Sequence, residues 1–135
     1  MKYLGIDYSA KKVGLALGDD TLRLAVPFDV LSGGEDVLHR ILVLAVSERI
    51  NAFVVGVPVP FRDVHHTKQH DRVLEFIKQL KEQSGLPVYE IDEVMTTREA
   101  KRVQDEYGST VKEDALAAMF ILQEFFDTHE TRETP

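Results

Sequence analysis

Cysteine is absent from the 135 residues of this chain. Its absence excludes disulfides, thiolate metal sites and cysteine nucleophiles, and it fits a reducing cytoplasm. The sequence also lacks an apolar run of membrane-spanning length, and residues 1–7 pass directly into a strand pattern without the features of a signal peptide. We therefore expect a cytoplasmic protein with no membrane partner.

Positive charge is scarce: 16 Lys and Arg residues face 23 Asp and Glu residues, which gives a formal net charge of -7. Because phosphate binding is usually carried by basic surface, this balance argues mildly against a nucleic-acid partner unless basic residues gather locally. The length and the hydrophobic content of 44% suit one compact domain. We expect that domain to cover residues 1–127, and residues 128–135 to form a polar C-terminal tail.

Strand and helix patterns alternate along the chain. Strands are expected over residues 3–8, 13–18, 22–28, 52–57 and 88–91. Helices are expected over residues 35–50, 69–83, 96–107 and 115–126. The first three strands predict a meander, and the unbroken apolar run at 52–57 predicts a strand at the centre of the sheet, covered on both faces. The order predicts an α/β fold with a mixed sheet flanked by helices.

Three carboxylates stand where these elements begin or end: Asp7, Glu93 and Asp114. Hard cations such as Mg²⁺ take clustered oxygen ligands, and two such cations can activate water and stabilise the leaving oxygen of a phosphodiester. The pattern suggests a metal-dependent phosphodiester hydrolase. Solvated surface acids are the plain alternative, and Asp114 taken alone is better explained as an ordinary acid at a helix start.

Five short motifs, in this order and spacing, resemble the YqgF family. They are LGID at 4–7, KKVGLA at 11–16, VVGVP at 54–58, DE at 92–93 with TT at 96–97 and Ala100, and Asp114 with AA at 117–118 and ILQ at 121–123. That family is described as Holliday-junction resolvases and pre-16S ribosomal RNA nucleases with a ribonuclease H-like, five-stranded fold. The resemblance covers residues 3–126 and implies an Mg²⁺- or Mn²⁺-dependent endonuclease.

The resemblance also implies roles for single residues. The implied catalytic and metal-binding residues are Asp7, Glu93 and Asp114, with Glu93 preferred to its neighbour Asp92. The implied substrate-phosphate contacts are Lys11, Thr96 and Thr97. The implied partner is structured nucleic acid, with pre-16S ribosomal RNA preferred and branched DNA second, bound by a monomer or a homodimer. Judged without the family, Lys11 and Lys12 fit a plain polar turn as well as a phosphate clamp.

The chain departs from the family pattern at three places. Ser9 replaces a glycine, Val94 replaces an arginine, and residues 59–62 replace a glycine-bearing loop. Losing the arginine removes a bidentate phosphate donor. A catalytically weakened nucleic-acid-binding or scaffold protein of the same fold is therefore an alternative, whereas a nucleotide phosphotransferase would need a second domain for which the chain has no room.

Two histidines, His66 and His70, have the i, i+4 spacing that places two imidazoles on one helix face. A structural zinc site normally has four ligands, and the neighbouring Asp63 and His65 do not complete a convincing set. We favour a solvated loop that leads into a helix.

Overall fold

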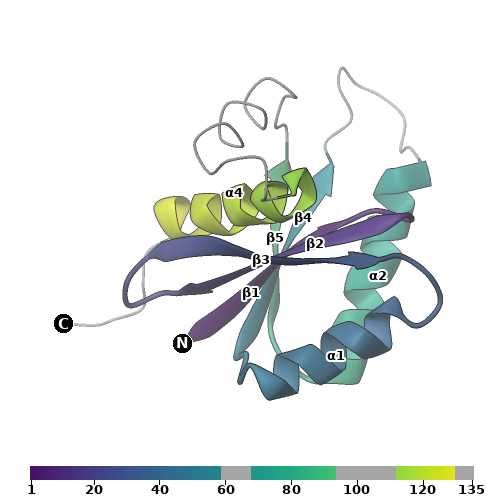
Figure 1. The fold of residues 1–135 in the computed structure, drawn as a ribbon, viewed down its shortest axis with the longest axis horizontal. Helices are drawn as coiled ribbons and strands as arrows, with labels where there is room; N and C mark the ends of the chain where they lie inside the picture. Colours follow the sequence, from purple (N-terminus) through teal and green to yellow (C-terminus); the bar gives the residue numbers. More distant parts are fainter. Residues whose placement is uncertain (59–67, 94–111, 130–135) are drawn as a thin grey trace.

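The computed structural model describes residues 1–58, 68–93 and 112–129. Five strands form one sheet in the order β3-β2-β1-β4-β5 (Figure 1). The strands are β1 (Lys2–Tyr8), β2 (Lys12–Asp19), β3 (Leu24–Ser32), β4 (Ala52–Pro58) and β5 (Val88–Glu93). The helices are α1 (Val37–Ser47), α2 (Lys68–Ser84) and α4 (Glu113–Thr128).

The sheet is mixed, as predicted. β1, β2 and β3 form the expected antiparallel meander, whereas β4 pairs in parallel with both β1 and β5. The middle strand is β1 and not β4, because β1 pairs with β2 through a hairpin on one side and with β4 across the α1 crossover on the other. β4 is nevertheless covered on both faces, since every residue from 52 to 57 is buried.

Several predicted boundaries were wrong by a few residues. The third strand begins at Leu24 because the preceding residue, Arg23, ends a turn with a φ of 52°. α1 stops at Ser47 because Arg49 takes a φ of 57°, which no regular helix continues. β5 extends two residues further than predicted, to Glu93. The helix expected over 96–107 and the loop over 59–67 lie outside the described residues.

The two faces of the sheet have different partners. α1 and α2 cover one face and α4 covers the other (Figure 1). Leu4 and Ile6 of β1 are buried against the α1 and α2 side, and the alternating Tyr3 is buried with α4. Because side chains alternate along a strand, Asp7 lies on the α4 face with Tyr3. Within the described residues, no helix combines the length and the apolarity that crossing a membrane requires.

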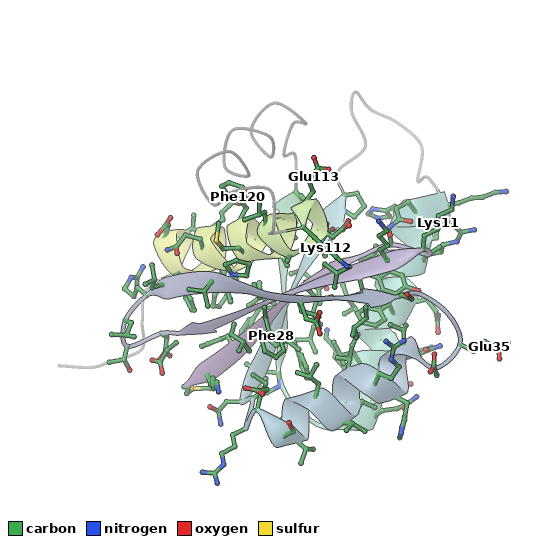
Figure 2. All side chains as sticks on the ribbon, in the orientation of Figure 1. Lys11, Phe28, Glu35, Lys112, Glu113 and Phe120 are labelled. Atoms are coloured by element: carbon green, nitrogen blue, oxygen red, sulfur yellow. The ribbon has the colours of Figure 1, made fainter. Side chains whose placement is uncertain are left out.

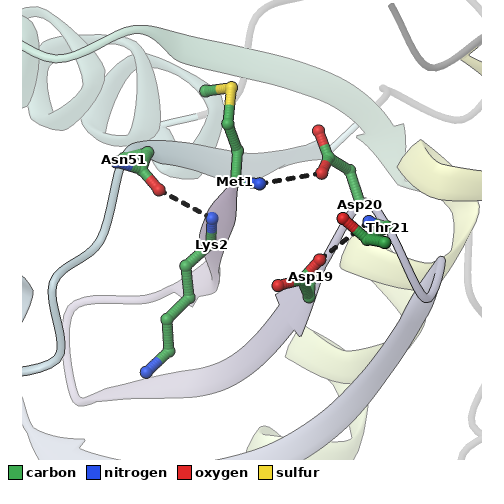
Figure 3. Close-up of polar contacts among 6 residues, drawn as sticks. All are labelled: Met1, Lys2, Asp19, Asp20, Thr21 and Asn51. Carbon is green, nitrogen blue, oxygen red and sulfur yellow. Dashed lines mark hydrogen bonds and ion pairs between the residues drawn. The ribbon is translucent and has the colours of Figure 1, made fainter. Parts of the chain in front are cut away.

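The end of the sheet where β1 begins is closed by paired polar groups (Figure 3). The N-terminal ammonium of Met1 donates to Asp20 at 2.9 Å, and the Lys2 amide donates to the Asn51 side chain at 2.8 Å. The Thr21 amide donates to Asp19 at 2.7 Å, and this hydrogen bond lowers the pKa of that carboxyl. Carboxylates at this end therefore have a structural explanation.

Candidate active site

Three carboxylates lie at the opposite end of the sheet. Asp7 is the penultimate residue of β1, Glu93 is the last residue of β5, and Asp114 is the second residue of α4. Figure 2 shows the beginning of α4, marked by Lys112 and Glu113, on the face of the sheet that α4 covers. Three elements that are distant in sequence thus bring one carboxylate each to the same face.

Asp114 reaches this face because α4 begins in contact with β2. Asp7 pairs with Gly14 across the β1–β2 ladder. A Cβ at position 14 would lie 1.9 Å from the carbonyl oxygen of Asp114, so only glycine permits this approach. The absence of a side chain at Gly14 therefore brings the start of α4 next to the strand pair that carries Asp7.

Glu93 is directed over the neighbouring strand. Its Oε2 atom lies 3.1 Å from the position that a Cβ of Gly56 would occupy. Ile91, two residues earlier, is buried against α4, so alternation places Glu93 on the α4 face. Asp92 falls on the opposite side of β5 and is exposed. Of the two adjacent acids, Glu93 is the one that faces the helix.

The carboxylates influence one another electrostatically. Burial, reinforced by the charge of Asp114, raises the pKa of Asp7 to about 6. Burial, reinforced by the charges of Asp7 and then Glu124, raises the pKa of Glu93 to about 7. These shifts are opposite to that of Asp19, whose carboxylate is satisfied by a backbone amide. Removing Asp7 and Glu93 from water is thus uncompensated within the described part of the chain.

Lys12 lies beside one of the three carboxylates, Asp114. The Nζ atom of Lys12 is 4.0 Å from Oδ2 of Asp114, and both side chains are partly exposed. In the three stretches that the structure describes, no group of three or more histidine, aspartate and glutamate side chains is arranged to hold a metal ion without movement. The carboxylates lie on one face of the sheet, and, in addition to burial, the charge of Asp114 raises the pKa of Asp7 and the charge of Asp7 raises the pKa of Glu93.

The first turn of α2 is anchored to this end of the sheet. The side-chain amide of Gln69 donates to the carbonyl oxygen of Tyr8 at 2.7 Å, directly after Asp7. Nδ1 of His70 lies 3.1 Å from the carbonyl oxygen of Pro58, and the Tyr8 ring stacks on Phe76 with centroids 4.3 Å apart. These contacts fix the ends of β1 and β4 relative to α2.

The residues predicted to contact phosphate are only partly described. Lys11 is exposed at the turn between β1 and β2 (Figure 2). Thr96, Thr97, Val94 and His66 lie outside the described residues. Sequence reasoning did not single out Gly14 or Gly56, although glycines inside strands signal close approach of another backbone or side chain. It also passed over the pairing of Lys12 with Asp114, for which the sequence contains no local signal.

The sequence relatives of this chain are named as nucleases or resolvases. A family model described as RuvX, Holliday junction resolvase, matches residues 1–128. A protein of Nitratidesulfovibrio vulgaris named "Putative pre-16S rRNA nuclease" is 34% identical over 142 residues, which cover 100% of this chain and 99% of the relative. A protein of Dictyoglomus thermophilum with the same name is 32% identical over 135 residues, with 95% and 96% of the two chains covered.

Solved structures share the fold at much lower identity. Thermus thermophilus RuvC, solved with a Holliday junction substrate, is 16% identical with a TM-score of 0.59, and the match covers 93% of each chain. The fowlpox virus resolvase, also solved with Holliday junction DNA, is 11% identical with a TM-score of 0.62, covering 95% of this chain and 98% of that one. The fold is therefore the ribonuclease H-like fold of these resolvases, and the chain belongs to the RuvX family of nucleases.

Proposed function

We propose that this chain is an Mg²⁺- or Mn²⁺-dependent endonuclease that hydrolyses phosphodiester bonds in structured nucleic acid. The observation that supports the proposal most is the gathering of Asp7, Glu93 and Asp114 from three elements onto one face. Two of the three, Asp7 and Glu93, are partly buried with raised pKa values. Keeping a partly buried carboxylate ionised costs free energy, and such carboxylates are characteristic of sites that bind a positively charged ligand.

The donor set suits a hard divalent cation. All three groups are carboxylates, the ligands that Mg²⁺ and Mn²⁺ prefer. In the described parts of the chain, no ion pair joins Asp7 or Glu93 to a lysine, arginine or histidine. Within the described residues, no basic side chain neutralises these two carboxylates, which supports a bound cation as their partner. Asp7, Glu93 and Asp114 are the residues that would hold it.

A divalent cation bound here would supply an activated water and would stabilise negative charge on the scissile phosphate. The protein's own contribution is placement. β1 and β5 fix Asp7 and Glu93 at the same edge of one sheet, and the contact with Gly14 fixes Asp114 beside them. The sheet would thus fix the backbone positions of the ligands, and their side chains would move to surround the cation.

The substrate we infer is structured RNA, with pre-16S ribosomal RNA preferred, because the relatives at 34% and 32% identity are named as nucleases of that RNA. The description of the family model supports branched DNA as a second substrate. A four-way junction has two-fold symmetry, so cutting it at paired positions requires two copies of the site and hence a homodimer. A measurement of the oligomeric state in solution therefore helps to distinguish the two substrates, because a monomer would argue against the four-way junction.

A cleavage assay tests the proposal. Purified protein is incubated with a structured precursor ribosomal RNA and with a four-way DNA junction, in Mg²⁺, in Mn²⁺ and in EDTA. We expect cleavage that requires the cation and that Asp7→Asn abolishes while the variant stays folded. A protein that binds either nucleic acid but cuts neither under any cation would instead be a binding or scaffold protein of the same fold.

A further inference from the structure

We propose that Lys12 binds a substrate phosphate beside the carboxylates and that Ser9 positions it. This assignment rests on the proposed nuclease function and names a binding contact within it. The resemblance to the family implied Lys11 for this task. The hydrogen bonds of the β1–β2 turn and the ion pair to Asp114 favour its neighbour.

The turn that carries Lys12 is closed by Ser9. The Ser9 hydroxyl donates to the Lys12 carbonyl oxygen at 2.8 Å and accepts from the Lys12 amide at 3.2 Å. The Ser9 amide donates to the same carbonyl oxygen at 3.0 Å. Three hydrogen bonds between two residues fix the backbone of Lys12. A glycine at position 9, as the family pattern has, would supply only the last of them.

Lys12 stands on the face of the sheet that carries the carboxylates. It lies two residues before Gly14, whose missing side chain faces Asp114, whereas the intervening Val13 is buried on the other face. Its Nζ atom lies 4.0 Å from Oδ2 of Asp114. The side chain is 62% exposed, so its remaining N–H groups are open to solvent and to a phosphate.

The ion pair between Lys12 and Asp114 contributes little to the stability of the fold. Exposed pairs of this kind contribute between nothing and about 1 kcal/mol, and 4.0 Å is at the outer limit of such contacts. An ammonium group near Asp114 has a clearer use when a phosphate arrives, because its charge then attracts an anion to a region that is otherwise acidic. In a chain with a net charge of -7, such local cations decide where nucleic acid binds.

Lys11 has a different setting. Its carbonyl oxygen accepts a hydrogen bond from the Gly33 amide at 2.8 Å, which joins the turn to the end of β3. Its side chain is exposed, and of the two lysines only Lys12 forms an ion pair with a carboxylate of the described residues. Lys11→Gln is therefore the comparison variant that separates the two lysines.

Binding without metal tests the assignment independently of cleavage. A fluorescein-labelled four-way DNA junction and a labelled RNA hairpin are titrated with protein in EDTA over a range of salt concentrations. We expect Lys12→Gln to weaken binding roughly tenfold and to lower the slope of log affinity against log salt by about 0.7–0.9, the value of one lost phosphate contact. Lys12→Arg should keep the slope. Lys81→Gln, with the same charge change in the last turn of α2, should leave it unchanged.

Cleavage kinetics and a double variant then test the role of Ser9. In Mg²⁺, Lys12→Gln should raise KM by more than it lowers kcat, because the lost contact exists before the transition state. Ser9→Ala should produce a smaller loss of affinity, and that loss should disappear in the Lys12→Gln background because Ser9 acts through Lys12. Additive losses from the two changes would show that Ser9 does not position Lys12.

The results distinguish this assignment from the function it rests on. If the wild-type protein binds nucleic acid and Lys12→Gln retains the full salt slope, the assignment of Lys12 is wrong and the nuclease proposal stands. A loss with Lys11→Gln but not with Lys12→Gln would also overturn it, in favour of Lys11. If the wild-type protein binds neither probe and cuts neither substrate, both proposals fail.

Discussion

The carbonyl oxygen of Asp114 lies 1.9 Å from the point that a Cβ at position 14 would occupy. Gly14→Ala must therefore displace the start of α4 or distort β2, because the atoms that the new Cβ would meet belong to the backbone of Asp114. We expect the change to destabilise the fold by roughly 3 kcal/mol or more and to weaken metal binding by moving Asp114. Thermal unfolding and a Mn²⁺ titration measure the two effects.

Gly85→Ala is the matched control for that substitution. Nothing lies within 4 Å of a Cβ built at this residue, and its φ of 68° makes alanine unfavourable only through the backbone. We expect a loss of about 1 kcal/mol with unchanged metal affinity. Equal losses of metal affinity in the two variants would mean that the contact between Gly14 and Asp114 does not place the site.

The stability of the metal-free protein should fall as the pH rises from about 4 to about 8. Asp7 and Glu93 have pKa values of about 6 and about 7 in the folded protein, above the ordinary values of 3.8 and 4.5. Between these values the folded state binds more protons than the unfolded state, so the free energy of unfolding decreases with pH. The two shifts together set an upper limit of about 6 kcal/mol for this loss, and solvent screening of these partly exposed carboxylates reduces the expected loss to a few kcal/mol.

A comparison with the double variant Asp7→Asn, Glu93→Gln isolates this effect from other titrating groups. The double variant should be more stable than the wild type at pH 8, and the difference should vanish near pH 4. Saturating Mg²⁺ should reverse the trend in the wild type, since metal binding requires the ionised carboxylates. Parallel pH profiles for the two proteins in EDTA would contradict the raised pKa values.

Gln69 should support the site without contacting the substrate. Its amide donates to the carbonyl of Tyr8 at 2.7 Å, so Gln69→Ala frees the end of β1 that carries Asp7. We expect a stability loss of about 1 kcal/mol and a severalfold weaker Mn²⁺ affinity. Gln79→Ala, which removes only an exposed contact to Glu75 within α2, is the control and should leave Mn²⁺ affinity unchanged.

Much of the fold was predictable because its signals are local. The meander, the buried strand β4 and the amphipathic helices follow from hydrophobic patterning that each segment carries itself. The pairing partners of β1 were harder to predict from the sequence. The position of β1 in the middle of the sheet depends on which side of β1 the crossover through α1 places β4. Boundaries failed where a single residue took a positive φ, as at Arg23 and Arg49, which composition does not reveal.

The candidate site was predictable to a different degree for each residue. Asp7, Glu93 and Asp114 could be selected because they end or begin elements and also match the family pattern, but their common face depends on contacts between distant segments. Gly14 allows one of those contacts, and its importance appears only once α4 is placed against β2. The metal roles of the three acids remain predictions, and the effect of Val94 falls outside the described residues.

Mn²⁺ binding measured by isothermal titration calorimetry tests the central claim most directly. Wild-type protein is compared with Asp7→Asn, Glu93→Gln and Asp114→Asn, and with Asp92→Asn as the control, because Asp92 is an exposed acid adjacent to Glu93. We predict that each of the three substitutions weakens binding at least about tenfold, as expected for a lost charged ligand, and that Asp92→Asn does not. Unchanged binding in all three variants, or a loss confined to Asp92→Asn, would contradict the account.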